Sequence, residues 1–231
     1  MGRPAHYSTE IATRCQRLIE RLVAQVEQDQ VLRQEFRGPL RTTFLLAMST
    51  PMIVLPMERL YKPIVNRSGV ADDTHLDPVV KDRVQTVFDG RGFQDTPLFE
   101  RGQWAYVSET DNFSVADPWP PGAFADLDRP ESLDAAATAP TKDILGCLRN
   151  ALAHGGIAYL DHRGRQSDDE TGMLGFASRP DGKRSALRLL RVSVDSYQRF
   201  LALWSNWLAD TGMEAMLTHH GPGWFERDEA A

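Results

Sequence analysis

The sequence predicts a mainly α-helical fold of the α+β class, with a small antiparallel β-sheet inserted before the last helix. Apolar residues recur at steps of three and four in segments 8–36, 76–89 and 141–154, which is the helical period. Three short apolar runs separated by turn residues follow, as is typical of strands. The 231 residues are 42% hydrophobic and 25% charged, a composition that supports a globular core.

The first helix is predicted over residues 8–36, with Ser8 as its N-cap and Gly38-Pro39 after its end. Its expected buried face consists of residues at helical spacing: Ile11, Cys15, Leu18, Leu22 and Val26. A second, strongly apolar helix is predicted over 40–62, with a break near Pro51 and Pro56. A third, over 76–89, ends at Gly90.

Residues 91–139 differ from the rest, because they are rich in proline and aspartate and show no clear period beyond a short helix or strand near Phe99 to Val107. We predict a single domain over residues 1–218, in which 91–139 form an acidic, mobile insertion. The hypothesis is that this insertion partly covers the functional site and repels an anionic ligand until it is displaced. Residues 219–231 are expected to be a flexible tail.

A clear helix is predicted over 141–154, with Thr141 as N-cap, Asp143 in the first turn and Gly155-Gly156 at the end. Strands are expected at 157–160, 173–178 and 186–192, with a turn at Pro180-Asp181-Gly182-Lys183. Ser193 is expected to cap the last helix. The inward residues of that helix are predicted to be Tyr197, Phe200, Leu201, Trp204 and Leu208.

Charge is unevenly distributed along the chain. Residues 1–62 and 141–199 each carry a net +3, whereas residues 63–140 carry −8 and the whole chain −6. An anionic ligand such as RNA would be attracted locally if the two basic segments meet in space.

Cys15 and Cys147 are predicted to be buried reduced thiols. The sequence shows neither a secretory signal nor an apolar run that could span a bilayer, which predicts a cytoplasmic protein without a membrane partner.

The segment from Leu148 to Gly155 carries the candidate chemistry. Arg149 and His154 lie about 140° apart around an ideal helix and about 7.5 Å apart along it, and Asn150 lies about 40° from His154. Histidine transfers protons near neutral pH, and arginine matches the geometry of a phosphate with parallel donors. Together with an orienting asparagine, these are the groups that RNA cleavage requires.

Arg149 and His154, with four residues between them, resemble the Arg-x4-6-His signature of HEPN proteins, and Asn150 resembles the polar residue that often follows that arginine. The resemblance is best over residues 141–210. It implies an HEPN-like helical bundle that forms a homodimer, cleaves RNA as an endoribonuclease without a metal ion or other cofactor, and acts as a toxin or in phage defence with an antitoxin or defence partner. It makes His154 the general base or acid, Arg149 the residue that stabilises the phosphorane, and Asn150 a supporting residue.

One position departs from the family. Some toxin members carry a tyrosine, modified by a partner enzyme, two residues after the histidine, and here that position is Gly156. The alternative function is a non-catalytic HEPN-like protein that binds RNA or a protein partner. A metal nuclease centred on Asp181 is the third hypothesis. Structural roles are expected for Asp168-Asp169-Glu170, His219-His220, Trp204 and Trp207.

Overall fold

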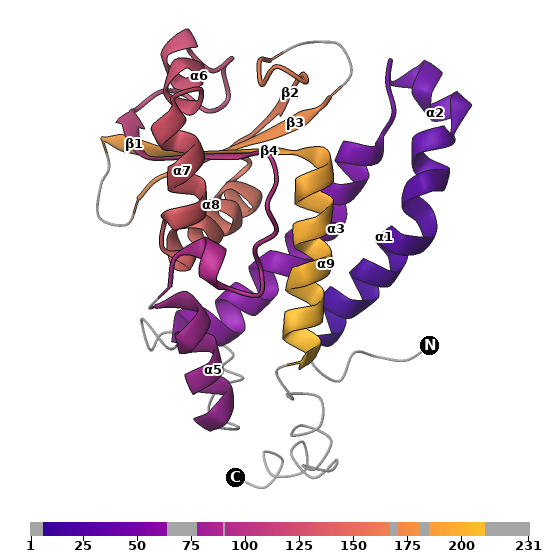
Figure 1. Ribbon diagram of the computed structural model, residues 1–231. Coiled ribbons are helices and arrows are strands. Elements are labelled where there is room, and N and C mark those ends of the chain that lie inside the picture. Colours follow the sequence, from indigo (N-terminus) through magenta and orange to yellow (C-terminus); the bar gives the residue numbers. More distant parts are fainter. Residues whose placement is uncertain (1–6, 64–77, 90, 167–170, 181–184, 211–231) are drawn as a thin grey trace, which may run out of the picture.

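The computed structural model describes residues 7–63, 78–89, 91–166, 171–180 and 185–210, and it confirms a mainly helical fold with an antiparallel sheet before the last helix (Figure 1). In chain order the elements are α1 (Glu10–Gln28), α2 (Gln30–Glu35), α3 (Arg41–Pro56), the π-helix η1 (Met57–Tyr61), α5 (Pro78–Phe88), the 3-10 turn η3 (Phe93–Asp95), β1 (Trp104–Asp111), α6 (Pro121–Leu127), α7 (Pro130–Thr138), α8 (Thr141–His154), β2 (Ile157–Leu160), β3 (Met173–Ser178), β4 (Ala186–Ser193) and α9 (Val194–Asp210).

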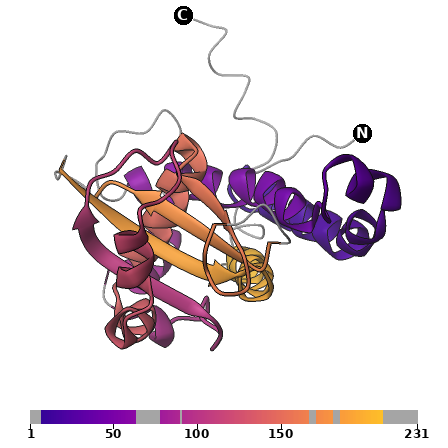
Figure 2. The ribbon, with the colours of Figure 1, turned by 90° about the horizontal axis from the view of Figure 1, so that it is seen from above.

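The predicted single helix over 8–36 is two helices, α1 and α2, separated at Asp29. The side chain of Asp29 accepts a hydrogen bond from the Leu32 amide at 3.0 Å and so caps a new helix. The predicted face of α1 is also partly wrong: Leu18 is 44% exposed, and the buried residues are Ala12, Gln16 and Ile19. These residues share the helical period too, and α1 turns them toward α3 and α9. In Figure 2, α1 and α2 extend away from the sheet.

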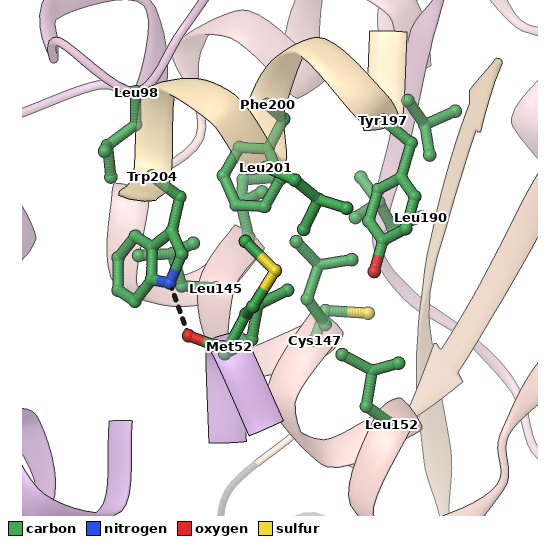
Figure 3. Close-up of a cluster of buried hydrophobic side chains, with 14 of the residues drawn as sticks. Met52, Leu98, Leu145, Cys147, Leu152, Leu190, Tyr197, Phe200, Leu201 and Trp204 are labelled. Carbon is green, nitrogen blue, oxygen red and sulfur yellow. Dashed lines mark hydrogen bonds between the residues drawn. The ribbon is translucent and has the colours of Figure 1, made fainter. Parts of the chain in front are cut away.

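The second helix, α3, continues through Pro51 to Pro56, where the chain passes into the π-helix η1. A proline has no N–H, so the carbonyl of Met52, four residues before Pro56, lacks its normal helical donor. The indole of Trp204 in α9 donates to that carbonyl at 2.6 Å (Figure 3). The predicted break near the prolines is therefore a change of helix type at Pro56, supported by a side chain from α9.

The four strands lie in the order β1-β4-β3-β2, and every neighbouring pair is antiparallel. All eight residues of β4, one of the two inner strands, are buried, because both faces of the sheet are covered. On one face, Leu190 and Val192 pack with α8 and α9; on the other, Leu187 and Leu189 pack with α6 and Trp119. The strands predicted at 157–160 and 173–178 are confirmed to the residue.

Segment 91–139 is built into this sheet rather than lying over it. β1 pairs along β4 from Trp104↔Val192 to Asp111↔Ala186, and α7 packs beside it. Trp119, Phe124 and Leu127 are buried in the core on the α6 face. Proline at the first turn of α6 and of α7 starts each helix, which explains why proline-rich sequence forms regular structure here. The prediction that this segment is a mobile insertion is therefore wrong, because its strand and helices are part of the folded core.

The helices predicted at 141–154 and after Ser193 are confirmed, with their apolar faces buried. Ser193 Oγ accepts from the Ser196 amide at 3.2 Å, as predicted for a cap. The predicted caps at Ser8 and Thr141 are wrong: Thr9 precedes α1, and Thr141 is the first residue of α8, with its hydroxyl bonded to the Arg91 carbonyl.

The predicted turn at 180–183, the acidic run 168–170 and the tail 219–231 lie wholly or largely outside the described residues. No helix in the described ranges is long and apolar enough to cross a bilayer.

Candidate functional site

The site is organised by the C-terminal end of α8. Ile144, Leu145 and Leu148 are fully buried and fix the helix against the sheet, which leaves Arg149, Asn150 and His154 toward the surface. The helix ends at Gly155, whose φ of +75° is the left-handed conformation that favours glycine. Gly156 follows with its Cα so close to the Ala177 carbonyl that a Cβ there would lie 2.2 Å from the oxygen. The two glycines thus let α8 stop at His154 and bring it to the end of β3.

Two surface cavities adjoin this helix end. The cavity called here the arginine pocket has a volume of about 600 Å³ and is lined by Met57, Glu58, Tyr61, Lys62, Lys142, Asp143, Gly146, Arg149, Asn150 and Arg188. The histidine pocket has a volume of about 560 Å³ and is lined by Asn112, Phe113, Ser114, Val115, Ala116, Asn150, His154, Gly156, Ala177, Ser178, Arg179 and Leu187.

Asn150 is the residue that lines both pockets. The structure therefore brings the three predicted residues to one helix end but gives Arg149 and His154 separate hollows on either side of Asn150. His154 is exposed, and the side chain of Arg149 keeps 23% exposure. Both groups are open to solvent rather than locked in the core, as a site for an external ligand requires.

Asn150 and Glu58 both hold the Arg149 side chain. Its guanidinium donates to Asn150 Oδ1 and forms an ion pair with Glu58 of η1. Glu58 also accepts from Lys62 at 2.8 Å, one helical turn later. Because Arg149 is a donor only, the Asn150 atom that receives it is the oxygen, and the amide nitrogen of Asn150 faces away from Arg149. Arg149 is thus oriented from two sides before any ligand binds.

Arg188 lies at the base of the arginine pocket and is almost fully buried, with 7% of its side chain exposed. Its Nη1 is 3.7 Å from a carboxylate oxygen of Asp143 and 3.4 Å from the Asp143 carbonyl. Burial raises the pKa of the neighbouring Tyr106 hydroxyl above its ordinary range, so this phenol stays neutral beside the guanidinium. A buried arginine with one partly exposed counter-charge leaves positive potential at the base of the pocket.

The two basic segments of the sequence meet here, as the charge distribution allowed. Lys62 comes from the first, and Lys142, Arg149 and Arg188 come from the second. These four cations stand against the two carboxylates of Glu58 and Asp143. The arginine pocket therefore carries a net positive charge of the kind that attracts a phosphate.

Glu58 and Arg188 were not predicted as site residues. Each has a signal in the sequence: Glu58 is the first charge after the uncharged run from Thr42 to Met57, and Arg188 is one of two arginines, with Arg191, in a largely apolar strand. Neither signal predicts a contact with α8, since both contacts join segments that are far apart along the chain.

A larger cavity of about 770 Å³ lies between α7 and the start of β1, and none of the three motif residues lines it. Within the described residues, no group of three His, Cys, Asp or Glu side chains is placed to hold a metal ion.

No protein-family model, curated protein or solved structure matches the chain. The functional argument therefore depends on the motif in α8 and on the geometry of the two pockets around it.

Proposed function

We propose that this protein is a metal-independent endoribonuclease of the HEPN class, a toxin or phage-defence effector that acts as a homodimer in the cytoplasm. The observation that carries the proposal is the open end of α8, where Arg149 faces a basic pocket and His154 faces an adjoining one, with Asn150 shared between them. A phosphate bound in the arginine pocket would place its attached ribose beside Asn150, on the side of Asn150 that faces the histidine pocket and His154.

The reaction follows from these groups. His154, as the neutral imidazole, takes the proton of the 2′-hydroxyl, whose oxygen attacks the adjacent phosphorus. The bond from phosphorus to the 5′-oxygen breaks, and a protonated acid gives that oxygen its proton. The products are a 2′,3′-cyclic phosphate and a 5′-hydroxyl. Arg149 stabilises the negative charge that builds up on the phosphorane oxygens.

The need for both a base and an acid favours a homodimer. Among the described residues that line the two pockets, His154 of the histidine pocket is the single histidine. One imidazole cannot be the deprotonated base and the protonated acid at the same time. A second copy would bring its own His154 to the same groove and supply the other role. Activity per chain should then rise with protein concentration in step with the dimer fraction measured by sedimentation.

The test of the proposal is cleavage of a labelled RNA in EDTA by the wild type, His154→Ala and His162→Ala. His154→Ala should lower the rate at least about 100-fold, the lower range for losing a general acid or base. His162 is also an exposed histidine, but it packs against Gly172 outside both pockets, so His162→Ala should retain wild-type activity. Metal-free cleavage that survives His154→Ala would remove His154 from the mechanism.

A second candidate is a non-catalytic HEPN-like protein that binds RNA or a protein partner. The ion pair between Arg149 and Glu58 favours this candidate, because the Glu58 carboxylate already neutralises the guanidinium charge that a phosphorane would need. This candidate predicts a gel shift with RNA, no turnover under any of the conditions above, and no loss of binding in Arg149→Ala.

A further inference from the structure

We infer that the histidine pocket is a base-binding subsite that holds one nucleobase of single-stranded RNA beside the scissile phosphate. The inference rests on the proposed function, because it assigns the neighbour of the arginine pocket to the same RNA strand. It adds the part of the substrate that is recognised, a nucleobase, and it names Phe113 on the 112–116 loop as the residue on which that base stacks.

The pocket combines an apolar lining with hydrogen-bonding groups, as a site for a base requires. Its apolar lining comes from Phe113, Val115, Ala177 and Leu187, and its polar and basic side chains are those of Asn112, Ser114, Asn150, His154, Ser178 and Arg179. A nucleobase has the same two parts, an apolar ring face and a hydrogen-bonding edge. The volume of about 560 Å³ lies within the range of small-ligand sites.

Phe113 is positioned to stack with such a ring. It is half-buried, and its ring centroid lies 5.7 Å from that of Trp119, which in turn stacks on Phe124 at 6.1 Å. Trp119 is buried between them. One side of Phe113 is therefore supported by two rings of the core, and the remaining surface lines the pocket. A ring fixed in this way loses little conformational entropy when a base stacks on it.

Asn150 connects the base to the phosphate. Its Oδ1 accepts from Arg149, so its amide nitrogen is a donor, and within the described part of the chain that nitrogen has no acceptor. Asn150 lines both pockets, so one nucleotide can span it with the phosphate toward Arg149 and the base toward Phe113. The ribose between them then lies on the His154 side, where the 2′-hydroxyl has to be.

The experiment uses strands that cannot be cut. A fluorescein-labelled single strand with 2′-O-methyl groups has no nucleophile, and an abasic strand of equal length with the same 2′-O-methyl groups has the same phosphates without bases. The wild type should bind the base-bearing strand about tenfold more tightly, the size expected for one stacked base. Phe113→Leu should lose at least half of that preference on a logarithmic scale while its affinity for the abasic strand stays unchanged.

Phe36→Leu is the matched control, because Phe36 is a 57% exposed aromatic residue at the end of α2, away from both pockets. It should keep the full preference. Since Phe113 also packs on Trp119, Ala116→Leu is a second variant that fills the pocket from an exposed position and leaves that contact intact. It should lower the preference as Phe113→Leu does.

Retention of the full preference by both Phe113→Leu and Ala116→Leu overturns the subsite, as does an equal loss of affinity for the two strands. Failure of the proposed function gives a different result. If the wild type cuts no RNA in EDTA but its base preference depends on Phe113, the nuclease proposal fails and the subsite stands. If it cuts RNA and the preference ignores Phe113, the subsite fails and the nuclease proposal stands.

Discussion

Trp204 donates its indole N–H to the main-chain oxygen of Met52 across 2.6 Å, and Pro56 is the reason that this oxygen is free to accept it. The bond joins α9 to α3 at the point where α3 changes into the π-helix η1. It satisfies a buried carbonyl and also fixes the helix that carries Glu58 against the last helix of the chain.

Trp204→Phe should lower the free energy of unfolding by about 2–4 kcal/mol, because it leaves the Met52 carbonyl buried without a donor and removes part of a buried ring. Trp207→Phe is the matched control: Trp207 is only partly buried, and its indole nitrogen has no acceptor within the described residues. It should cost less than about 1 kcal/mol. Urea unfolding followed by circular dichroism measures both.

Pro56→Ala provides the second side of a double-mutant cycle. An alanine at this position has an N–H that can donate to Met52, so Trp204→Phe should cost about 1 kcal/mol less in the Pro56→Ala background than in the wild type. Additive costs would contradict the assignment of the indole bond to the carbonyl that Pro56 leaves without a helical donor.

Glu58→Gln should strengthen binding of an uncleavable RNA strand roughly fivefold, because it removes a negative charge next to Arg149, worth on the order of 1 kcal/mol at a surface site. Glu20→Gln is a suitable control, since Glu20 also pairs with an arginine but lies on exposed α1. Fluorescence anisotropy at two salt concentrations measures both affinities. Weaker binding by Glu58→Gln would instead make Glu58 a residue that positions Arg149 for its ligand.

The two cysteines should differ in reactivity. Complete burial raises the pKa of Cys147 to about 11, and partial burial raises that of Cys15 in the same direction. At pH 8 a short pulse of iodoacetamide should label Cys15 well before Cys147 in the folded protein, as read by mass spectrometry of peptides. Equal labelling of the two sites would contradict the buried position of Cys147.

The Cys147 pKa also makes stability depend on pH. The folded state favours the protonated thiol, so its contribution is complete below the ordinary pKa of about 9 and is lost as pH rises toward 11. Cys147→Ala should remove this part of the loss between pH 9 and 11. An unchanged pH dependence in the variant would assign the loss to other groups.

Deletion of residues 108–138 should unfold the protein. It removes the second half of β1, all of α6 and all of α7, together with the buried Trp119, Phe124 and Leu127. Loss of a cooperative thermal transition in the purified variant is the expected result. A folded deletion variant with increased RNA cleavage would restore the hypothesis that this segment is a removable cover.

Some local patterns in the sequence predicted the local structure, whereas the caps at Ser8 and Thr141 and the single helix over 8–36 were wrong. The period of three and four in 141–154, the Gly155-Gly156 stop and the serine cap at Ser193 each depend on residues within one or two turns, and each is found. For β1 (Trp104–Asp111) the sequence predicted only a short helix or strand near Phe99 to Val107. Its partner β4 lies about 80 residues later, and the buried character of β1 exists only once the two strands are paired.

The same difference between local and distant residues holds for the candidate site. Arg149, Asn150 and His154 were found because six neighbouring residues of one helix contain them. Glu58, Arg188 and Phe113 were missed, because each reaches the site from another part of the chain. Their placement depends on the packing of α8 against the sheet and against η1, which no window of sequence contains.

The π-helix gives the site a property that substitutions alone do not reveal. A π turn holds one residue more than an α turn, and residues along a helix are about 100° apart. Loss of Met57, the residue directly before Glu58, would move Glu58 back by one position, about 100° around the helix axis and away from Arg149. The length of this short stretch, in addition to the side chain at position 58, therefore decides whether a carboxylate lies beside the Arg149 guanidinium.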